Sequence, residues 1–273
     1  MNKKHKIVAL TPAGRKKYME VLFPQILKQR DFVDEYHLWV NTKNPEDLAY
    51  LNQLGEDYKG FVVLHKDFAH DDSVGHVFNI TKYWCKAKEQ GVVYFRLDDD
   101  IVYIEDDYFS KMYEFKMKHP EFIMTTANVV NNALFDFYRQ SEGRVYQNLP
   151  KMTPECMCPV GWKNPEVAEL RHREALSYLK EGNKEILYTE NKQVTQETRF
   201  SINTLCWLGD DLADVTVSSD EEVYVTVSLT ADKKRSIGVL GSCIACHYAF
   251  HTQRDHLSKT NILEEYKRLT AEV

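Results

Sequence analysis

The sequence predicts an α/β fold in which helices cover both faces of a mostly parallel central sheet. In the first hundred residues, short apolar runs alternate with segments of helical periodicity, the pattern of parallel strands joined by helices. Turn residues separate these segments, as in the stretch Thr-Pro-Ala-Gly at 11–14 and at Gly91. The contents of hydrophobic residues (43%) and charged residues (28%) are typical of a globular protein.

The elements of the first half follow in order. Strands are expected at 6–10, 35–41, 61–65 and 92–97, and helices at 15–29, 45–54 and 78–90. In a sheet of this kind, ligands bind beyond the carboxyl ends of the strands. The sequence therefore marks three loops as candidates for binding, at 11–15, 41–44 and 98–100.

The second half is less regular. We expect helices at 105–119, 164–182 and from 261 onward, a strand at 122–126, and a strand-rich stretch at 236–250. Residues 141–165 are expected to form a long loop, and the polar stretch 188–197 a lid. Because no linker or repeat is visible, we expect one domain over 1–273, with a binding half at 1–104 and an elaborated half at 105–273.

The composition excludes several classes of protein. The 273 residues carry 35 basic and 41 acidic side chains, a net charge of −6 that argues against broad coating of nucleic acid. No window approaches the ~20 apolar residues of a spanning helix, and the apolar run after the basic start is too short for a signal peptide. We therefore expect a cytoplasmic protein with no integral membrane segment; peripheral contact with a membrane stays open.

Six cysteines raise the question of a metal or haem site. Cys243-x-x-Cys246-His247 has the spacing of a haem attachment site or of half a zinc site, with Cys156 and Cys158 as a second half. Haem attachment would need export, and Cys-x-Cys is not the usual zinc spacing. We therefore expect reduced thiols packed in the interior.

The most informative stretch follows the apolar strand 92–97, which runs directly into Asp98-Asp99-Asp100. Three adjacent carboxylates repel one another unless a cation or strong donors lie among them. At the end of a central strand they suit Mg²⁺ or Mn²⁺, which take oxygen ligands together with substrate phosphates. The alternative is a solvated loop in which an Asp caps a helix.

This arrangement resembles the GT-A glycosyltransferases, a family with a Rossmann-like nucleotide-binding half and an Asp-x-Asp motif after a central strand. The resemblance implies that Asp98 and Asp100 hold a divalent metal bridging the diphosphate of a nucleotide-sugar. It also implies that Asp99 faces the sugar or the ribose.

The resemblance further assigns the remainder of the nucleotide-sugar site. The loop after the first strand would hold the base and the ribose, and the alternative is a simple turn. Polar residues before the metal motif would lie near the nucleotide, and the alternative is an exposed helix face. The residues implied are Thr11, Pro12, Ala13, Arg15, Asn41, Asn79, Lys82 and Arg96.

A second acidic cluster, Asp220-Glu221-Glu222, resembles the motif that supplies the catalytic base in inverting members. A positioned carboxylate can take the proton of the acceptor hydroxyl. Glu222 aligns best with this role, and Glu221 and Asp220 are rivals. The alternative is a helix N-terminus with acidic first-turn residues.

A histidine near the C-terminus completes the metal site in many members of the family. Here His247 or His251 could do so, and we prefer His247. Arg254 would contact phosphate. On the acceptor side we expect the segment 199–211, as a strand pair or a helix, to line the cleft. Asp210 and Asp211 would bind hydroxyls, and Trp162 and Trp207 would stack on sugar rings.

The function expected from these features is metal-dependent transfer of a hexosyl or pentosyl group from a UDP- or GDP-sugar to a carbohydrate or glycoconjugate hydroxyl, with inversion. Such an enzyme would serve polysaccharide or glycoconjugate synthesis. A nucleotidyltransferase using the same carboxylates and a non-catalytic sugar- or metal-binding module are the alternatives. A modified DNA base is a minority acceptor, and the oligomeric state stays open.

Overall fold

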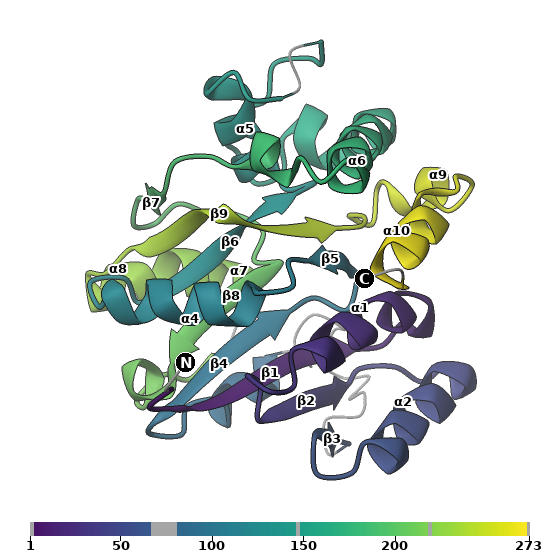
Figure 1. Ribbon diagram of the computed structural model, residues 1–273. Coiled ribbons are helices and arrows are strands. Elements are labelled where there is room, and N and C mark those ends of the chain that lie inside the picture. Colours follow the sequence, from purple (N-terminus) through teal and green to yellow (C-terminus); the bar gives the residue numbers. More distant parts are fainter. Residues whose placement is uncertain (1–2, 67–80, 146–147, 218–219, 272–273) are drawn as a thin grey trace.

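The computed structural model describes residues 3–66, 81–145, 148–217 and 220–271, with the side chains of residues 81 and 82 excepted. It is a mixed α/β structure built on one nine-stranded sheet (Figure 1). The strand order is β3-β2-β1-β4-β8-β6-β9-β5, and β7 pairs with β9. The predicted α/β class, with helices on both faces of a mostly parallel sheet, is confirmed.

The first half has the predicted alternation. Its elements are β1 (Lys6–Ala13), α1 (Lys16–Lys28), β2 (Glu35–Val40), α2 (Pro45–Asp57), β3 (Val62–His65), the helical turn η1 (Thr81–Cys85) and β4 (Val92–Leu97). Strands β1, β2, β3 and β4 pair in parallel. Buried side chains on consecutive residues of β1 and β4 explain why these two strands lie inside the sheet, whereas β3 forms its edge.

The second half is built around the long strand β9. The first elements are β5 (Ile101–Ile104), α4 (Tyr108–Lys118), β6 (Met124–Val130), α5 (Ala133–Ser141), η2 (Pro159–Lys163), α6 (Pro165–Lys180) and η3 (Lys184–Leu187). They are followed by β7 (Lys192–Val194), β8 (Thr204–Leu208), η4 (Gly209–Leu212), α7 (Glu221–Val223), η5 (Tyr224–Ser228), α8 (Leu229–Lys233), β9 (Ile237–His247), α9 (Arg254–Leu257) and α10 (Ile262–Ala271).

Strand direction gathers the functional segments at one edge of the sheet. Strand β8 is antiparallel to β4 and to β6, and β6 is parallel to β9. The carboxyl ends of β1, β2, β4, β6 and β9 therefore lie at the same edge, where β8 begins. Asp98 follows β4 and His247 ends β9, so residues 149 positions apart meet there.

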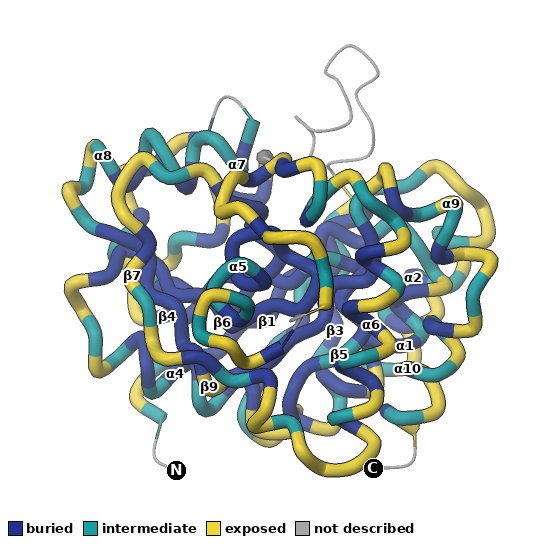
Figure 2. The backbone as a smooth tube through the Cα atoms, turned by 90° about the horizontal axis from the view of Figure 1, so that it is seen from above, coloured by how far each residue is buried: buried dark blue, intermediate teal, exposed yellow. Residues whose placement is uncertain are grey.

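Helices lie on both faces of β4, as two successive side chains show. The Phe95 ring contacts Phe109 of α4 at 5.1 Å between centroids. The next residue, Arg96, points the opposite way and bonds Tyr83 of η1 and Glu221 of α7. Figure 2 shows the strands buried between these layers, with exposed residues on the outer helices and loops.

Several expectations for local structure were wrong. Residues 11–13 continue β1 instead of starting a loop, and within the described residues the helix expected at 78–90 is only η1. The expected loop 141–165 contains η2 near its end. The short strand β7 inside the expected lid was missed, because only one of its three residues is apolar. Strand β8 lies in the segment 199–211, for which the sequence left a strand pair or a helix open.

Five of the six cysteines are buried as expected, whereas Cys85 is exposed. Cys243 and Cys246 are fully buried in β9, and Cys156 and Cys158 are also buried. Within the described residues, the group suited to hold a metal contains no cysteine. No helix of the described part is both long and apolar enough to span a membrane.

Candidate metal and nucleotide site

A cleft of about 560 Å³ lies at the edge where the strands end. The ends of β1, β2, β4 and β9 form its floor, and the segments around η2, before β8 and at α7 form its walls. The residues that line it include Pro12, Gly14, Arg15, Asn41, Thr42, Lys43, Arg96, Asp98, Asp99, Asp100, Met157, Trp162, Arg199, Ser201, Asn203, Asp220, Glu221, Glu222, His247, Phe250, His251 and Arg254.

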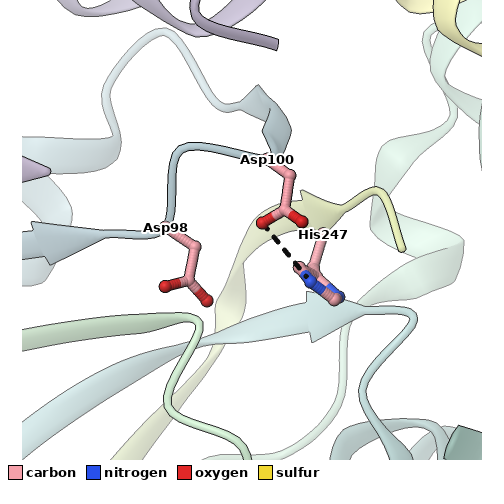
Figure 3. Close-up of side chains that lie close together, drawn as sticks. All are labelled: Asp98, Asp100 and His247. Carbon is pink, nitrogen blue, oxygen red and sulfur yellow. Dashed lines mark ion pairs between the residues drawn. The ribbon is translucent and has the colours of Figure 1, made fainter. Parts of the chain in front are cut away.

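Asp98, Asp100 and His247 form a compact cluster on this floor (Figure 3). One potential ligand atom of each lies within 4.8 Å of those of the other two. The Nδ1 atom of His247 lies 3.2 Å from the carbonyl oxygen of Asn131, and the Nε2 atom lies 3.5 Å from Asp100. The carbonyl can only accept a hydrogen bond, so Nδ1 carries the proton and Nε2 is free to bind a metal.

The donor set fits a hard divalent cation. Two carboxylates and a neutral imidazole suit Mn²⁺ and Mg²⁺, with Mn²⁺ favoured by the nitrogen ligand. The buried Oδ2 atom of Asp100 accepts no hydrogen bond, although Arg15 lies 3.0 Å and Arg254 3.6 Å away. A buried carboxylate oxygen without a hydrogen bond is typical of a position that a ligand completes.

The two outer carboxylates differ in their electrostatic surroundings. Burial raises the pKa of Asp98 to about 6, against the opposing attraction of Arg96. Burial also acts on Asp100, but the Arg15 guanidinium, together with the adjacent His247 ring and Arg254, outweighs it and holds the pKa of Asp100 below its usual range. One ligand is therefore ionised throughout the physiological range, and the other titrates near its lower end.

The middle residue, Asp99, lines the cleft but is buried, and its carboxylate is bound by neighbouring protein groups. Its carboxylate binds the Arg15 guanidinium and accepts a hydrogen bond from the backbone N–H of Gly14 at 3.0 Å. A Cβ at Gly14 would lie 2.7 Å from the carbonyl oxygen of Asn41, so only glycine fits this turn. The expected contact of Asp99 with sugar or ribose is replaced here by a bond that fixes the β1 loop.

Arg96 links the two acidic clusters inside the protein. It is buried, and one guanidinium nitrogen lies 2.9 Å from Asp98 and 2.7 Å from Glu221. Its Nε atom donates to the Tyr83 hydroxyl at 2.7 Å. Arg96 borders the cleft, but these partners make it a support for Asp98 instead of the free nucleotide contact that we expected.

The second acidic cluster divides into three different roles. Asp220 caps α7 by accepting hydrogen bonds from the backbone N–H groups of Glu222 and Val223. Glu221 is buried, with one oxygen on Arg96 and the other accepting from Tyr83 and Trp84. Glu222 is 20% exposed and lines the cleft.

Two neighbours hold Glu222 in place. Arg199 donates from Nε at 2.8 Å, and the Cys156 thiol donates at 3.2 Å, both to the same carboxylate oxygen. Burial and the Glu222 charge raise the pKa of Cys156 to about 12, so the thiol keeps the proton that it donates. The other oxygen of Glu222 is the one left for a ligand.

The structure brings some predicted residues into the cleft and not others. Pro12, Asn41 and Arg254 line it, whereas Thr11 and Ala13 are buried and do not. The Thr11 hydroxyl accepts a hydrogen bond from Tyr36. Asn79 lies outside the described residues, as does the side chain of Lys82.

On the acceptor side the expectations divide in the same way. His251 lines the cleft beside Trp162 but is not part of the metal cluster. Trp207 is fully buried in the core, with its indole N–H bonded to Ala87. Asp210 accepts a hydrogen bond from the backbone of Gly91, and Asp211 pairs with basic residues away from the cleft. The prediction that these two residues bind acceptor hydroxyls is therefore wrong.

Sequence reasoning missed three supporting residues. Asn203 donates to Asp98 at 3.1 Å and is itself held by Asn132. Arg199 lies in the segment expected near the acceptor, but its bond to Glu222 was not foreseen. Cys156 was considered only as a packed thiol or a zinc ligand. All three contacts depend on tertiary pairing across the cleft and leave no local signal in the sequence.

The comparisons with known proteins show the fold. No protein-family model and no curated protein matches the sequence. GalNAc-T7 with UDP, GalNAc and Mn²⁺ is a similar solved structure, with a TM-score of 0.52 at 12% identity over 99% of this chain. The match spans 48% of that chain, about half its length. The central sheet and its helices have the GT-A-like arrangement.

Two synthetases align over nearly the whole of both chains with lower scores. CMP:2-keto-3-deoxy-manno-octonic acid synthetase complexed with CTP has a TM-score of 0.46 at 12% identity, covering 98% of this chain and 99% of that one. The 4-diphosphocytidyl-2C-methyl-D-erythritol synthase from Anaerococcus prevotii has a TM-score of 0.43 at 11% identity, covering 95% and 98%.

Proposed function

We propose that this protein is a divalent-metal-dependent glycosyltransferase that uses a UDP- or GDP-sugar. The observation that carries the proposal is the cluster of Asp98, Asp100 and His247 on the floor of a 560 Å³ cleft. A bound Mn²⁺ or Mg²⁺ would supply Lewis-acid neutralisation of the diphosphate. The solved structure of GalNAc-T7 contains ligands of this kind, UDP and Mn²⁺.

The rest of the donor site follows from the cleft. Arg254 is 42% exposed and adjoins Asp100, so its guanidinium can bind a phosphate oxygen next to the metal. The ends of β1 and β2 present Pro12, Asn41 and Thr42, which suit the base and ribose. Arg15 and Asp99 hold the loop between them in one conformation.

Glu222 is the residue proposed as catalytic base. Asp220 is occupied by the helix cap, and both oxygens of Glu221 have buried partners. Asp220 also lines the cleft, but Glu222 is the carboxylate that Arg199 and Cys156 hold by one oxygen, which leaves its other oxygen for a ligand. It would take the proton of the acceptor hydroxyl as that oxygen attacks the sugar, with inversion.

The same metal site would also serve nucleotidyl transfer, in which the attack falls on a phosphorus atom and pyrophosphate leaves. A triphosphate needs more positive charge than a diphosphate. In the described part of the β1 loop, Arg15 is paired with Asp99 and Asp100, and Lys16 with Glu46. These pairs favour glycosyl transfer from a diphosphate-linked donor.

The test is to incubate the protein with UDP- and GDP-sugars and, separately, with nucleoside triphosphates, each with and without Mn²⁺. We expect Mn²⁺-dependent release of UDP or GDP and no pyrophosphate, together with a higher melting temperature when nucleotide and Mn²⁺ are added together. Asp98→Asn should lose both responses.

Two results would count against the proposal. Release of pyrophosphate from a triphosphate would assign nucleotidyl transfer to the same site. If no nucleotide raises the melting temperature in the presence of Mn²⁺, a nucleotide-sugar is excluded as the donor substrate.

A further inference from the structure

The segment from Cys156 to Trp162 connects the two ends of the proposed catalytic centre. At its start, the Cys156 thiol donates to Glu222. At its end, the Trp162 ring contacts Phe250 at 5.9 Å between centroids, and the Phe250 ring contacts the metal-site residue His247 at 4.5 Å. Met157 and Trp162 of this segment line the same cleft as Glu222 and His247.

This part of the cleft has an apolar and aromatic wall. Met157 lines the cleft and is 49% exposed, which is unusual for so large an apolar side chain. Trp162 is partly exposed beside it and meets the His251 ring edge-on at 4.8 Å. The facing groups are polar and include Glu222, Arg199, Ser201 and Asn203.

Buried polar groups hold the wall rigidly. The Trp162 carbonyl accepts hydrogen bonds from Thr252 at 2.7 Å and from Gln253 at 3.1 Å. The carbonyl of Gly161 accepts from the fully buried Arg171 at 2.8 Å, and Arg171 pairs with Asp136. Burying an ion pair is costly, and this buried pair holds the turn that positions Trp162.

The glycine before Trp162 fits the same interpretation. A Cβ at Gly161 would lie 2.8 Å from the Cys158 sulfur and 2.9 Å from Ala133. The turn is therefore packed against α5 with no room to shift. A rigid aromatic surface next to hydroxyl-binding groups is the usual composition of a carbohydrate subsite, because a sugar ring has an apolar C–H face and a polar rim.

We propose that Met157, Trp162, Phe250 and His251 form the acceptor subsite and that its occupant is a sugar ring stacked on Trp162. The stacked ring directs a hydroxyl toward Glu222 and the metal-bound donor. This inference rests on the proposed function, and it narrows the acceptor to a carbohydrate. A lipid chain would find apolar groups on one side only, because the opposite wall is polar.

Tryptophan fluorescence provides a test that does not depend on turnover. All four tryptophans are in the described residues, and Trp39, Trp84 and Trp207 are buried, so an added sugar can reach Trp162 alone among them. Titration with methyl glucoside, galactoside, mannoside and N-acetylglucosaminide should change the emission of the wild type with at least one of them. Trp162→Phe should abolish the change.

Activity then tests the position of the subsite. With the UDP- or GDP-sugar that is turned over, Trp162→Ala should raise the glycoside concentration for half-maximal stimulation about tenfold, whereas Trp162→Phe should change it less. The rise in melting temperature with nucleotide and Mn²⁺ should persist in both variants. Leu170→Ala, which truncates a 50% exposed apolar side chain on α6 outside the cleft, is the matched control and should behave as the wild type.

Three results would overturn the inference. The first is that no glycoside changes the emission of a protein that binds nucleotide and Mn²⁺. The second is that octanol changes the emission but no glycoside does. The third is that Trp162→Ala and Leu170→Ala need the same glycoside concentration for half-maximal stimulation. Failure of the proposed function is separate, because it would abolish the thermal shift and leave the fluorescence titration readable.

Discussion

The two acidic clusters, Asp98–Asp100 and 220–222, look alike in the sequence but differ in what their oxygens bind. In the first, the buried Oδ2 atom of Asp100 accepts no hydrogen bond, and the Nε2 atom of His247 lies 3.5 Å from the other oxygen, Oδ1. In the second, a helix cap and a buried arginine occupy Asp220 and Glu221. A run of carboxylates becomes a metal site only where oxygens stay free and fixed neighbours aim them at one point.

The largest effect should come from the first cluster. Asp100→Asn removes a metal ligand and half of the charge that the two outer carboxylates supply, so activity should fall by about 10³-fold or more. The rise in melting temperature caused by Mn²⁺ with UDP or GDP should disappear. Differential scanning fluorimetry and a nucleotide-release assay measure both effects.

Asp106→Asn is the matched control, because Asp106 is an exposed carboxylate six residues farther along the chain that does not line the cleft. It should keep the Mn²⁺-dependent shift and the activity. A normal shift in Asp100→Asn would show that the cluster is not the metal site, and the contrast between the two clusters would no longer hold.

The next largest effect should come from Glu222 in the second cluster. Glu222→Gln keeps the shape and the contact with Arg199 but removes the base, so turnover should fall by about 10²–10⁴-fold. Nucleotide and Mn²⁺ should still raise the melting temperature, because Glu222 is not in the metal cluster. Turnover above a tenth of the wild-type value would exclude Glu222 as the base.

Glu221→Gln should lower the free energy of unfolding. The change leaves the buried Arg96 with Asp98 as its remaining carboxylate, and loss of one partner of a buried pair costs about 3 kcal/mol. Urea unfolding at pH 7.5 should show this loss in the free energy of unfolding. Glu56→Gln, at an exposed position on α2, should stay within about 0.5 kcal/mol of the wild type.

Lower pH should weaken the metal site in a predictable direction. A carboxylate must lose its proton to bind a metal, and the pKa of Asp98 is raised to about 6 by burial. Asp100 stays ionised, so protonation of Asp98 alone should lower the affinity for Mn²⁺ about tenfold from pH 7 to pH 5, and any protonation of His247 would add to this loss. Isothermal titration at constant ionic strength measures it, and an affinity independent of pH would contradict the raised pKa.

The fold of the first half could be predicted from the sequence because β1 and β4 are continuous buried runs and helical periodicity separates the first strands. The place of strand β8 between β4 and β6 could not, since it depends on antiparallel pairing across the chain. The carboxyl-edge rule marked the loops at 11–15, 41–44 and 98–100, and residues of all three line the cleft. His247 was expected from the resemblance and not from this rule.

The roles within each cluster could not be predicted. Asp99 and Arg96 have the residue types of ligand contacts, and only the structure shows that Arg15 and Glu221 already bind them. Sequence spacing specifies which charges lie near the cleft. It does not specify which of them are neutralised by partners more than eighty residues away.

The smallest effect should come from Asp220, and it separates a structural from a catalytic carboxylate. Its Oδ1 atom accepts hydrogen bonds from the N–H groups of Glu222 at 2.9 Å and Val223 at 3.2 Å. Asp220→Ala should therefore cost about 1 kcal/mol of stability, whereas Asp220→Asn, an equally good cap, should cost little. Because the carboxylate is needed only as a cap, Asp220→Asn should retain turnover although it has lost the negative charge. If Asp220→Asn instead loses turnover as Glu222→Gln does, then Asp220 also takes part in proton transfer, and the second cluster contains two functional carboxylates.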